Sequence, residues 1–173
     1  MTHKVFISYH HADQKEVDDF ISKFDDDKNI LISRALGMAD DIINSTDSDY
    51  IMRRIRQLYL EDSTVTIVLM GKCTWARRYI DWEIQASLRN GETVTPNGLL
   101  GIKLKSFDQY YPERLNNNLK GKDDVECYAR VINYPSDAAE LEKWIEDAFN
   151  ARTTRARYIK NPRAHFEYNR SCE

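Results

Sequence analysis

The chain has 173 residues, of which 42% are hydrophobic and 31% charged, and its formal net charge is −3. This length suits one domain and buries enough surface to need neither a structural metal nor a disulfide staple. A slightly acidic chain gives no reason to expect a nucleic-acid or anionic-membrane partner.

The cysteines and the apolar runs bear on the cellular compartment. Cys73, Cys127 and Cys172 are odd in number, far apart and outside any metal-ligand spacing, so we expect reduced thiols. No secretory leader precedes the first apolar run, and no run approaches the roughly 20 apolar residues of a membrane-spanning helix. The sequence therefore predicts a soluble, cytoplasmic protein.

The N-terminal part of the chain predicts a strand, a helix and a second strand. Residues 4–9 form a short apolar run typical of a buried strand. Asp13, with Glu16 at the capping-box position, indicates a helix that ends near residue 24. A second short strand is expected over residues 29–33.

The segment 34–48 lacks a clear period and is rich in Asp, Ser, Asn and Thr, so it predicts a long irregular loop. Loops of that length in compact domains are often functional. Ser48 or Asp49 is expected to cap the next helix. The buried stripe of that helix is predicted to comprise Ile51, Ile55 and Leu58.

The middle of the chain contains the clearest elements. Residues 65–70 are apolar at almost every position, which predicts a central strand buried on both faces. A turn over 71–74 leads into a helix that ends near Arg89. Residues 99–104 predict a fourth strand.

The C-terminal part is less regular. A polar loop is expected over 107–124 and a short fifth strand over 129–133. Pro135, Ser136 and Asp137 open a last helix, whose core face is predicted to comprise Leu141, Trp144, Ile145 and Ala148. We divide the chain into a domain over 1–151 and a basic tail or extra elements over 152–173.

The alternation of strands and helices predicts an α/β protein with a mainly parallel sheet covered on both faces. The order of the elements favours a flavodoxin-like, doubly wound sheet of four to five strands.

Several familiar α/β sites are excluded by missing motifs. The chain lacks a P-loop, a GxGxxG fingerprint after the first strand and a GxSxG nucleophile elbow. The strand that ends at Met70 lacks the phospho-acceptor aspartate of a receiver domain. The four histidines form no metal spacing, so no metal site is predicted.

Polar side chains follow the first predicted strand. Ser8, Tyr9, His10 and His11 stand where open α/β sheets bind ligands, at the carboxyl end of a strand. A purely structural alternative has Ser8 capping the turn and Tyr9 packing in the core.

Glu83 is the second candidate. It lies between Trp82 and Ile84 at the edge of a buried helical stripe, where poor solvation would raise the pKa of its carboxyl. The alternative is an exposed carboxylate paired with Arg78 or Arg89.

Together these segments resemble TIR domains, above all the bacterial TIR-like group of ThsB proteins of Thoeris anti-phage defence. The first TIR box is a Phe-Ile-Ser-Tyr strand, which stands here at residues 6–9. The ThsB pattern after the third strand is matched by residues 67–71, Thr74, residues 77–80 and the Trp82-Glu83-Ile84 run. The resemblance covers about residues 4–105.

The resemblance implies an enzyme that cleaves the nicotinamide–ribose bond of NAD⁺. Such proteins release ADP-ribose, cyclise it or join it to another group to make a signalling nucleotide. NAD⁺ is then a substrate, and no prosthetic group is implied. In Thoeris the diffusible nucleotide activates a partner effector during phage infection, which implies a phage-derived trigger, and related domains assemble with copies of themselves.

Residue roles also follow from the resemblance. Glu83 would be the catalytic carboxylate, which holds the ribose hydroxyls and faces the developing positive charge. Trp75, Tyr79 or Trp82 would stack on nicotinamide or adenine, although tryptophans at such positions also serve as core residues. Ser8 and His10 lie where the family places a diphosphate- or ribose-binding edge. Animal relatives often have arginine in place of His10, so anion contacts here would depend on pH.

The segment 34–48 resembles the family's loop between the second strand and second helix, which in assembling TIR domains completes the active site. Its sequence departs from animal TIR domains, which leaves head-to-tail assembly open. Asp40, Asp41, Ser45 and Asp49 are candidate ribose contacts, with loop solvation and helix capping as the alternative.

Two other functions stay open: a non-catalytic TIR scaffold that signals by protein–protein association, and a sensor that binds NAD⁺-like ligands without cleaving them. The basic tail contains Arg152, Arg155, Arg157, Lys160 and Arg163. Without regularly interleaved aromatic residues it favours a solvated segment or a partner contact over nucleic-acid binding.

Overall fold

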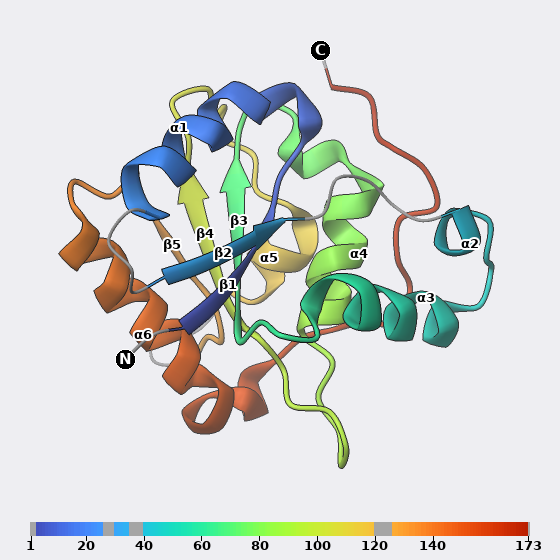
Figure 1. Cartoon of the computed structure of the whole chain (residues 1–173). Helices are drawn as coiled ribbons and strands as arrows, with labels where there is room; N and C mark the ends of the chain where they lie inside the picture. Colours follow the sequence, from blue (N-terminus) through green and yellow to red (C-terminus); the bar gives the residue numbers. More distant parts are fainter. Residues whose placement is uncertain (1–2, 26–29, 35–39, 120–125, 173) are drawn as a thin grey trace.

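A computed structural model describes residues 3–25, 30–34, 40–119 and 126–172, which form a parallel sheet between two layers of helices (Figure 1). The sheet has five strands in the order β2-β1-β3-β4-β5, with every neighbouring pair parallel. This order is that of flavodoxin-like folds, and it confirms the predicted fold class. The strands are β1 (His3–Ser8), β2 (Ile30–Arg34), β3 (Val65–Met70), β4 (Gly98–Lys103) and β5 (Arg130–Ile132).

The helices fill the connections between the strands. They are α1 (Gln14–Phe24), α2 (Asp40–Ile43), α3 (Ser48–Ile55), α4 (Arg78–Ser87), α5 (Glu113–Asn117) and α6 (Ala138–Thr154). A π-helical turn over Arg56–Leu60 continues α3, and 3₁₀ turns lie at His11–Asp13, Thr74–Ala76 and Ala156–Tyr158. No helix in the described ranges is both long and apolar enough to span a bilayer.

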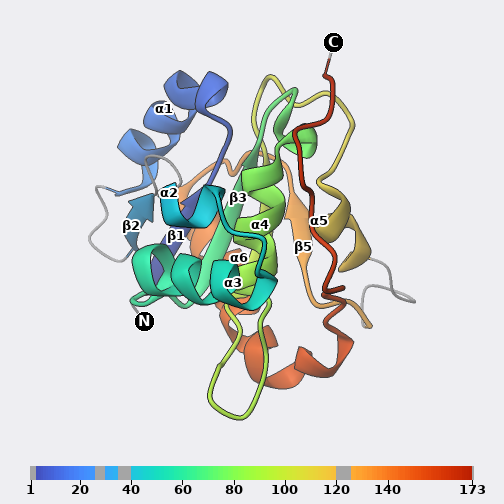
Figure 2. The same cartoon turned by 90° about the vertical axis from the view of Figure 1, so that its right-hand side faces the viewer.

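The strands are buried on both faces because helices cover both sides (Figures 1 and 2). Helices α1 and α6 pack with Val5 and Ile7 on one face. Helices α3 and α4 cover Phe6 on the other face, where α4 and α5 also cover Val68. All six residues of β3 are buried, as their uniformly apolar sequence predicts.

Several local expectations are wrong. Asp47 caps α3, because its carboxylate accepts hydrogen bonds from the backbone N–H groups of Asp49 and Tyr50; Ser48 and Asp49 do not cap it. Leu58 is 44% exposed, since the π-helical turn rotates it away from the buried stripe. Asp13 occupies the N-cap position of α1 as predicted, but its carboxylate makes no capping hydrogen bond.

Two predicted loops contain helices. Helix α2 interrupts the expected loop 34–48, of which residues 35–39 lie outside the described residues. Helix α5 interrupts the expected loop 107–124, of which residues 120–124 lie outside them. Both helices are about one turn long, too short to produce a periodic apolar pattern.

The last described residues, 159–172, form a C-terminal strap that runs along α4 (Figure 2). The indole N–H of Trp82 donates to the carbonyl of Phe166 at 2.7 Å, and the side-chain amide of Gln85 donates to the carbonyl of Arg163 at 3.0 Å. The strap is thus packed against α4, whereas the basic segment was expected to be solvated or to contact a partner.

A disulfide joins the strap to the turn after β3. Cys73 and Cys172 are bonded across a sequence separation of 99 residues, whereas Cys127 is buried, forms no disulfide and accepts a hydrogen bond from Arg130. The expectation of three reduced thiols is therefore wrong for this pair. The sequence could not place the two together because the strap's path depends on tertiary contacts with α4.

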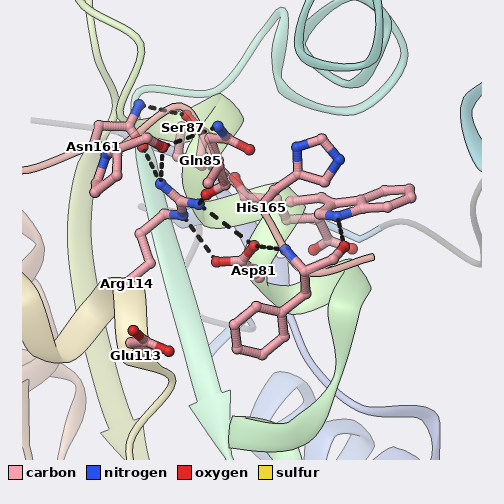
Figure 3. Close-up of polar contacts among 12 residues, drawn as sticks. Asp81, Gln85, Ser87, Glu113, Arg114, Asn161 and His165 are labelled. Carbon is pink, nitrogen blue, oxygen red and sulfur yellow. Dashed lines mark hydrogen bonds and ion pairs between the residues drawn. The ribbon is translucent and has the colours of Figure 1, made fainter. Parts of the chain in front are cut away.

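Arg114 of α5 ties α4 to the strap (Figure 3). Its Nε donates to the Asp81 carboxylate at 2.9 Å, and both side chains are almost fully buried. Its terminal nitrogens donate to the Asn161 side chain and to the carbonyls of Pro162 and Ala164, at 2.7 to 2.9 Å. The guanidinium is therefore fully used in joining three segments.

Replacing Arg114 with methionine should lower the free energy of unfolding by about 3–5 kcal/mol, because it leaves the Asp81 carboxylate buried without its cation. Urea unfolding measures the change. Glu113→Gln is the control, since it breaks only the exposed ion pair with Arg170 and should cost under about 1 kcal/mol. A loss in Arg114→Met no larger than in the control would contradict this role.

Candidate active site at the carboxyl edge of the sheet

Glu83 lies on α4, whose residues from Ile80 to Ser87 are all buried. The helix is buried all round because the sheet, α3 and the strap each cover one side of it. Glu83 itself is 7% exposed, so the alternative of an exposed surface carboxylate is excluded. Arg78 and Arg89, its suggested partners, donate instead to the carbonyls of Glu167 and Asp49.

Ser8 lies beside the Glu83 carboxyl. It is the last residue of β1, and strand alternation places it with Phe6 on the face that α4 covers. Its hydroxyl is fully buried and forms no hydrogen bond of standard geometry, although it lies close enough to Glu83 to affect the titration of the carboxyl. Buried hydroxyls usually have a partner, and the Glu83 carboxyl is placed to be that partner.

Burial raises the pKa of Glu83 from an ordinary value of 4.5 to about 8, and the Ser8 hydroxyl acts in the opposite direction. No cation among the described residues forms an ion pair with this carboxyl. The free protein therefore holds Glu83 mainly protonated at neutral pH. A neighbouring positive charge would favour the carboxylate.

The raised pKa of Glu83 should make stability fall as pH rises. The unfolded chain loses this proton near pH 4.5 and the folded chain near pH 8, so the folded state binds the extra proton between these values. The free energy of unfolding then decreases by up to about 1.4 kcal/mol per pH unit across that window. In Glu83→Gln this decrease should disappear.

Urea unfolding at pH 5, 6.5 and 8 measures the effect. The stability advantage of Glu83→Gln over the wild type should grow with pH, while the exposed control Glu61→Gln should follow the wild type. An advantage of Glu83→Gln that is constant across the three pH values would contradict the burial of a protonated carboxyl.

The two residues after Ser8 lie apart from each other. The Tyr9 phenol donates to the Gln14 side chain at 2.9 Å and packs on the face covered by α1 and α6, away from α4. His10 is half-buried, and its burial, together with the charges of His11 and Arg77, lowers its pKa to about 4. His10 is therefore neutral at physiological pH, beside a permanent cation.

Arg77 and Asp13 join this edge of the sheet, although the sequence did not single out either as a site residue. The Nε of Arg77 is buried without a hydrogen bond, whereas one of its terminal nitrogens donates to the carbonyl of Arg170. The Asp13 carboxylate accepts a 3.4 Å hydrogen bond from Thr74 and lies over Gly71, where a Cβ would come within 2.3 Å of it. Gly71, directly after β3, was the sequence feature that could have indicated a close approach of another side chain at this turn.

The two tryptophans have different environments. Trp75 is half-buried, and its ring lies 5.4 Å from that of Tyr110, which is 53% exposed. Trp82 is 3% exposed and packs among core residues against Tyr79 and His165. Trp75 thus retains surface that a ligand can reach. The ring of Trp82 is almost completely covered by other residues of the protein.

The acidic and hydroxyl candidates of the α2–α3 region lie outside the Ser8–Glu83 cluster. Asp49 is exposed and pairs with Arg163 at 2.8 Å, and Asp40 is exposed at the start of α2. Asp41 accepts hydrogen bonds from Tyr50 and Arg54. Ser45 lines a cavity of about 580 Å³ between the α2–α3 linker, α4 and the strap, which Trp82 also lines but Glu83 does not.

No group of three or more histidine, cysteine or carboxylate side chains in the described ranges is arranged to hold a metal ion. The chemistry available at the Ser8–Glu83 cluster is therefore that of a desolvated carboxyl and a buried hydroxyl, with Arg77 and Trp75 elsewhere at the same edge of the sheet. Such a set can stabilise a positive charge that develops on a bound substrate.

Comparisons with known proteins identify the family of the chain. A model of the family described as "Thoeris protein ThsB, TIR-like domain" matches residues 6–109. A curated relative from Bacillus cereus (strain MSX-D12) is named "Putative cyclic ADP-D-ribose synthase ThsB1". It is 26% identical over 148 residues, which cover 82% of this chain and 69% of the relative. The chain thus belongs to the ThsB TIR-like domain family of Thoeris proteins.

Proposed function

We propose that this protein cleaves the nicotinamide–ribose bond of NAD⁺ and converts the ADP-ribose portion into a signalling nucleotide. The observation that carries the proposal is the buried Glu83 carboxyl, which lies beside the Ser8 hydroxyl and has no ion-pair partner among the described residues. The family match and the name of the Bacillus relative support the same substrate class.

The reaction suits a desolvated carboxylate. When the C–N bond breaks, its electron pair leaves with nicotinamide, which departs neutral, and the ribose carbon becomes cationic. Glu83, ionised once the cationic nicotinamide ring is bound, stabilises this charge, and the poorly solvated surroundings strengthen the attraction. Water, or a nucleophile within the same nucleotide, then captures the ribose carbon to give ADP-ribose or a cyclic product.

The remaining residues of the edge would position the substrate. Ser8 would hydrogen-bond a ribose hydroxyl, and Arg77 beside the neutral His10 would contact the diphosphate. Trp75 with Tyr110 offers an aromatic surface for stacking.

The wider role follows from the same proposal. The product would diffuse to a partner effector during phage infection, and a phage component or self-assembly of the protein would switch the activity on. Asp40, Ser45 and Asp49 would contribute only if the α2–α3 region moved toward Glu83.

Glu83→Gln should lower NAD⁺ turnover by at least about 10²-fold, since it removes the charge that stabilises the transition state. Nicotinamide release is measured with concentrated purified protein and in lysate of phage-infected cells, and mass spectrometry of the same samples identifies the product.

The exposed variant Glu61→Gln should keep wild-type turnover. If no NAD⁺ were lost in any condition and Glu83→Gln still protected infected cells, the proposed catalysis would be contradicted. A scaffold that signals by association would then be favoured.

The rate should also depend on pH through Glu83. The carboxylate is the active form, and the pKa of Glu83 in the free protein is raised to about 8. We expect kcat/KM for NAD⁺ to rise about tenfold per pH unit between pH 6 and 7.5 and to level off above pH 8. Initial rates at low NAD⁺ give this profile, and a flat profile from pH 6 to 9 would contradict the assignment.

A further inference from the structure

A cluster of arginines surrounds the base of a hairpin at the amino edge of the sheet, opposite Ser8. The hairpin comprises residues 89–97, with a bridge between Gly91 and Val94, and projects beyond the strands (Figure 1). Arg56 donates to the carbonyls of Ala86 and Thr95 at 2.7 and 3.0 Å.

Two further arginines approach the same base. Arg152, near the end of α6, donates to the carbonyl of Pro96 at 2.9 Å. Arg89 begins the hairpin and has only a 3.5 Å hydrogen bond to the carbonyl of Asp49. Three guanidinium groups from three elements thus meet at one place.

These charges are not neutralised by the protein. None of the three arginines forms an ion pair with a carboxylate in the described part of the chain. Partial burial and the charges of Arg89 and Arg152 lower the pKa of Arg56, so the cluster is mutually repulsive. An external anion would reduce this repulsion, and of the three arginines Arg89 is the one that lines the cavity described next.

A cavity of about 520 Å³ opens beside Arg89, between the hairpin and the segment that follows α6. Asn90, Thr93 and Asn161 supply polar lining. Arg157 and Lys160, both exposed, adjoin the lining residues Ala156 and Ile159 in sequence and likewise form no ion pair with a described carboxylate. The volume lies in the range of small-ligand sites.

We propose that this cavity is a second ligand site, which binds a phosphate-bearing ligand of nucleotide size with Arg89 as its principal phosphate contact. Arginine matches phosphate because its planar fork donates two parallel hydrogen bonds. Asn90 and Thr93 would then face the non-phosphate part of the ligand, because the Asn161 side chain is already hydrogen-bonded to Arg114 and to the carbonyl of Gln85. The cavity is open to solvent and of limited volume, with one arginine in its lining, which favours a small molecule over a nucleic-acid strand that would need an extended basic groove.

Backbone amide NMR of the full chain tests the site, with sodium pyrophosphate and then ADP titrated at constant ionic strength. We expect saturable shifts in residues 89–94 and 156–161, weakening of binding at higher salt, and tighter binding of ADP than of pyrophosphate. Arg89→Gln should weaken binding about tenfold or more, through loss of charge-assisted hydrogen bonds. It should fold normally, since Arg89 has a single long hydrogen bond.

Arg53→Gln is the matched control, an exposed arginine of α3 outside the cavity, and it should bind as the wild type does. Shifts confined to residues 8–13 and 74–77, binding unaffected by Arg89→Gln, or a response only to a DNA oligonucleotide would each overturn the proposal. ADP binding no tighter than pyrophosphate would overturn the nucleotide size. Since the readout requires no NAD⁺ turnover, its outcome is independent of the proposed catalysis.

Discussion

The buried ion pair between Asp81 and Arg114 holds together parts of the chain that are distant in sequence. Two desolvated charges are expensive unless every hydrogen-bonding position is satisfied, and here the guanidinium finds acceptors on α4 and the strap. Its geometry therefore requires α4, α5 and the strap to be in place at once. The outer side of α4 is fixed by this pair, which leaves the inner side to face β1.

That inner side carries the opposite electrostatic arrangement. Glu83 is as desolvated as Asp81, yet no cation accompanies it. Two residues apart on one helix, one carboxyl serves the architecture and the other opposes it. A group that destabilises the fold and is nevertheless kept in place by its surroundings is typical of functional sites, where stability is given up for reactivity.

The sequence predicted what depends on periodicity. The almost entirely apolar run of β3 predicted the central strand, and the apolar neighbours of Glu83 predicted the buried carboxyl. It did not predict what depends on partners brought together by tertiary structure. Helix α5 is too short to show a period, the Cys73–Cys172 bond joins positions 99 residues apart, and Asp13 reaches Gly71 only through the fold.

The strap is held against α4 and α5 mainly by hydrogen bonds to its backbone. Side chains of α4 and α5 bind the carbonyls of residues 162, 163, 164, 166 and 167, and the Phe166 N–H donates to Asp81. A peptide group is the same whichever residue carries it. Most of the strap's own side chains can therefore change during evolution while its path persists, so relatives can share this segment even where its sequence differs.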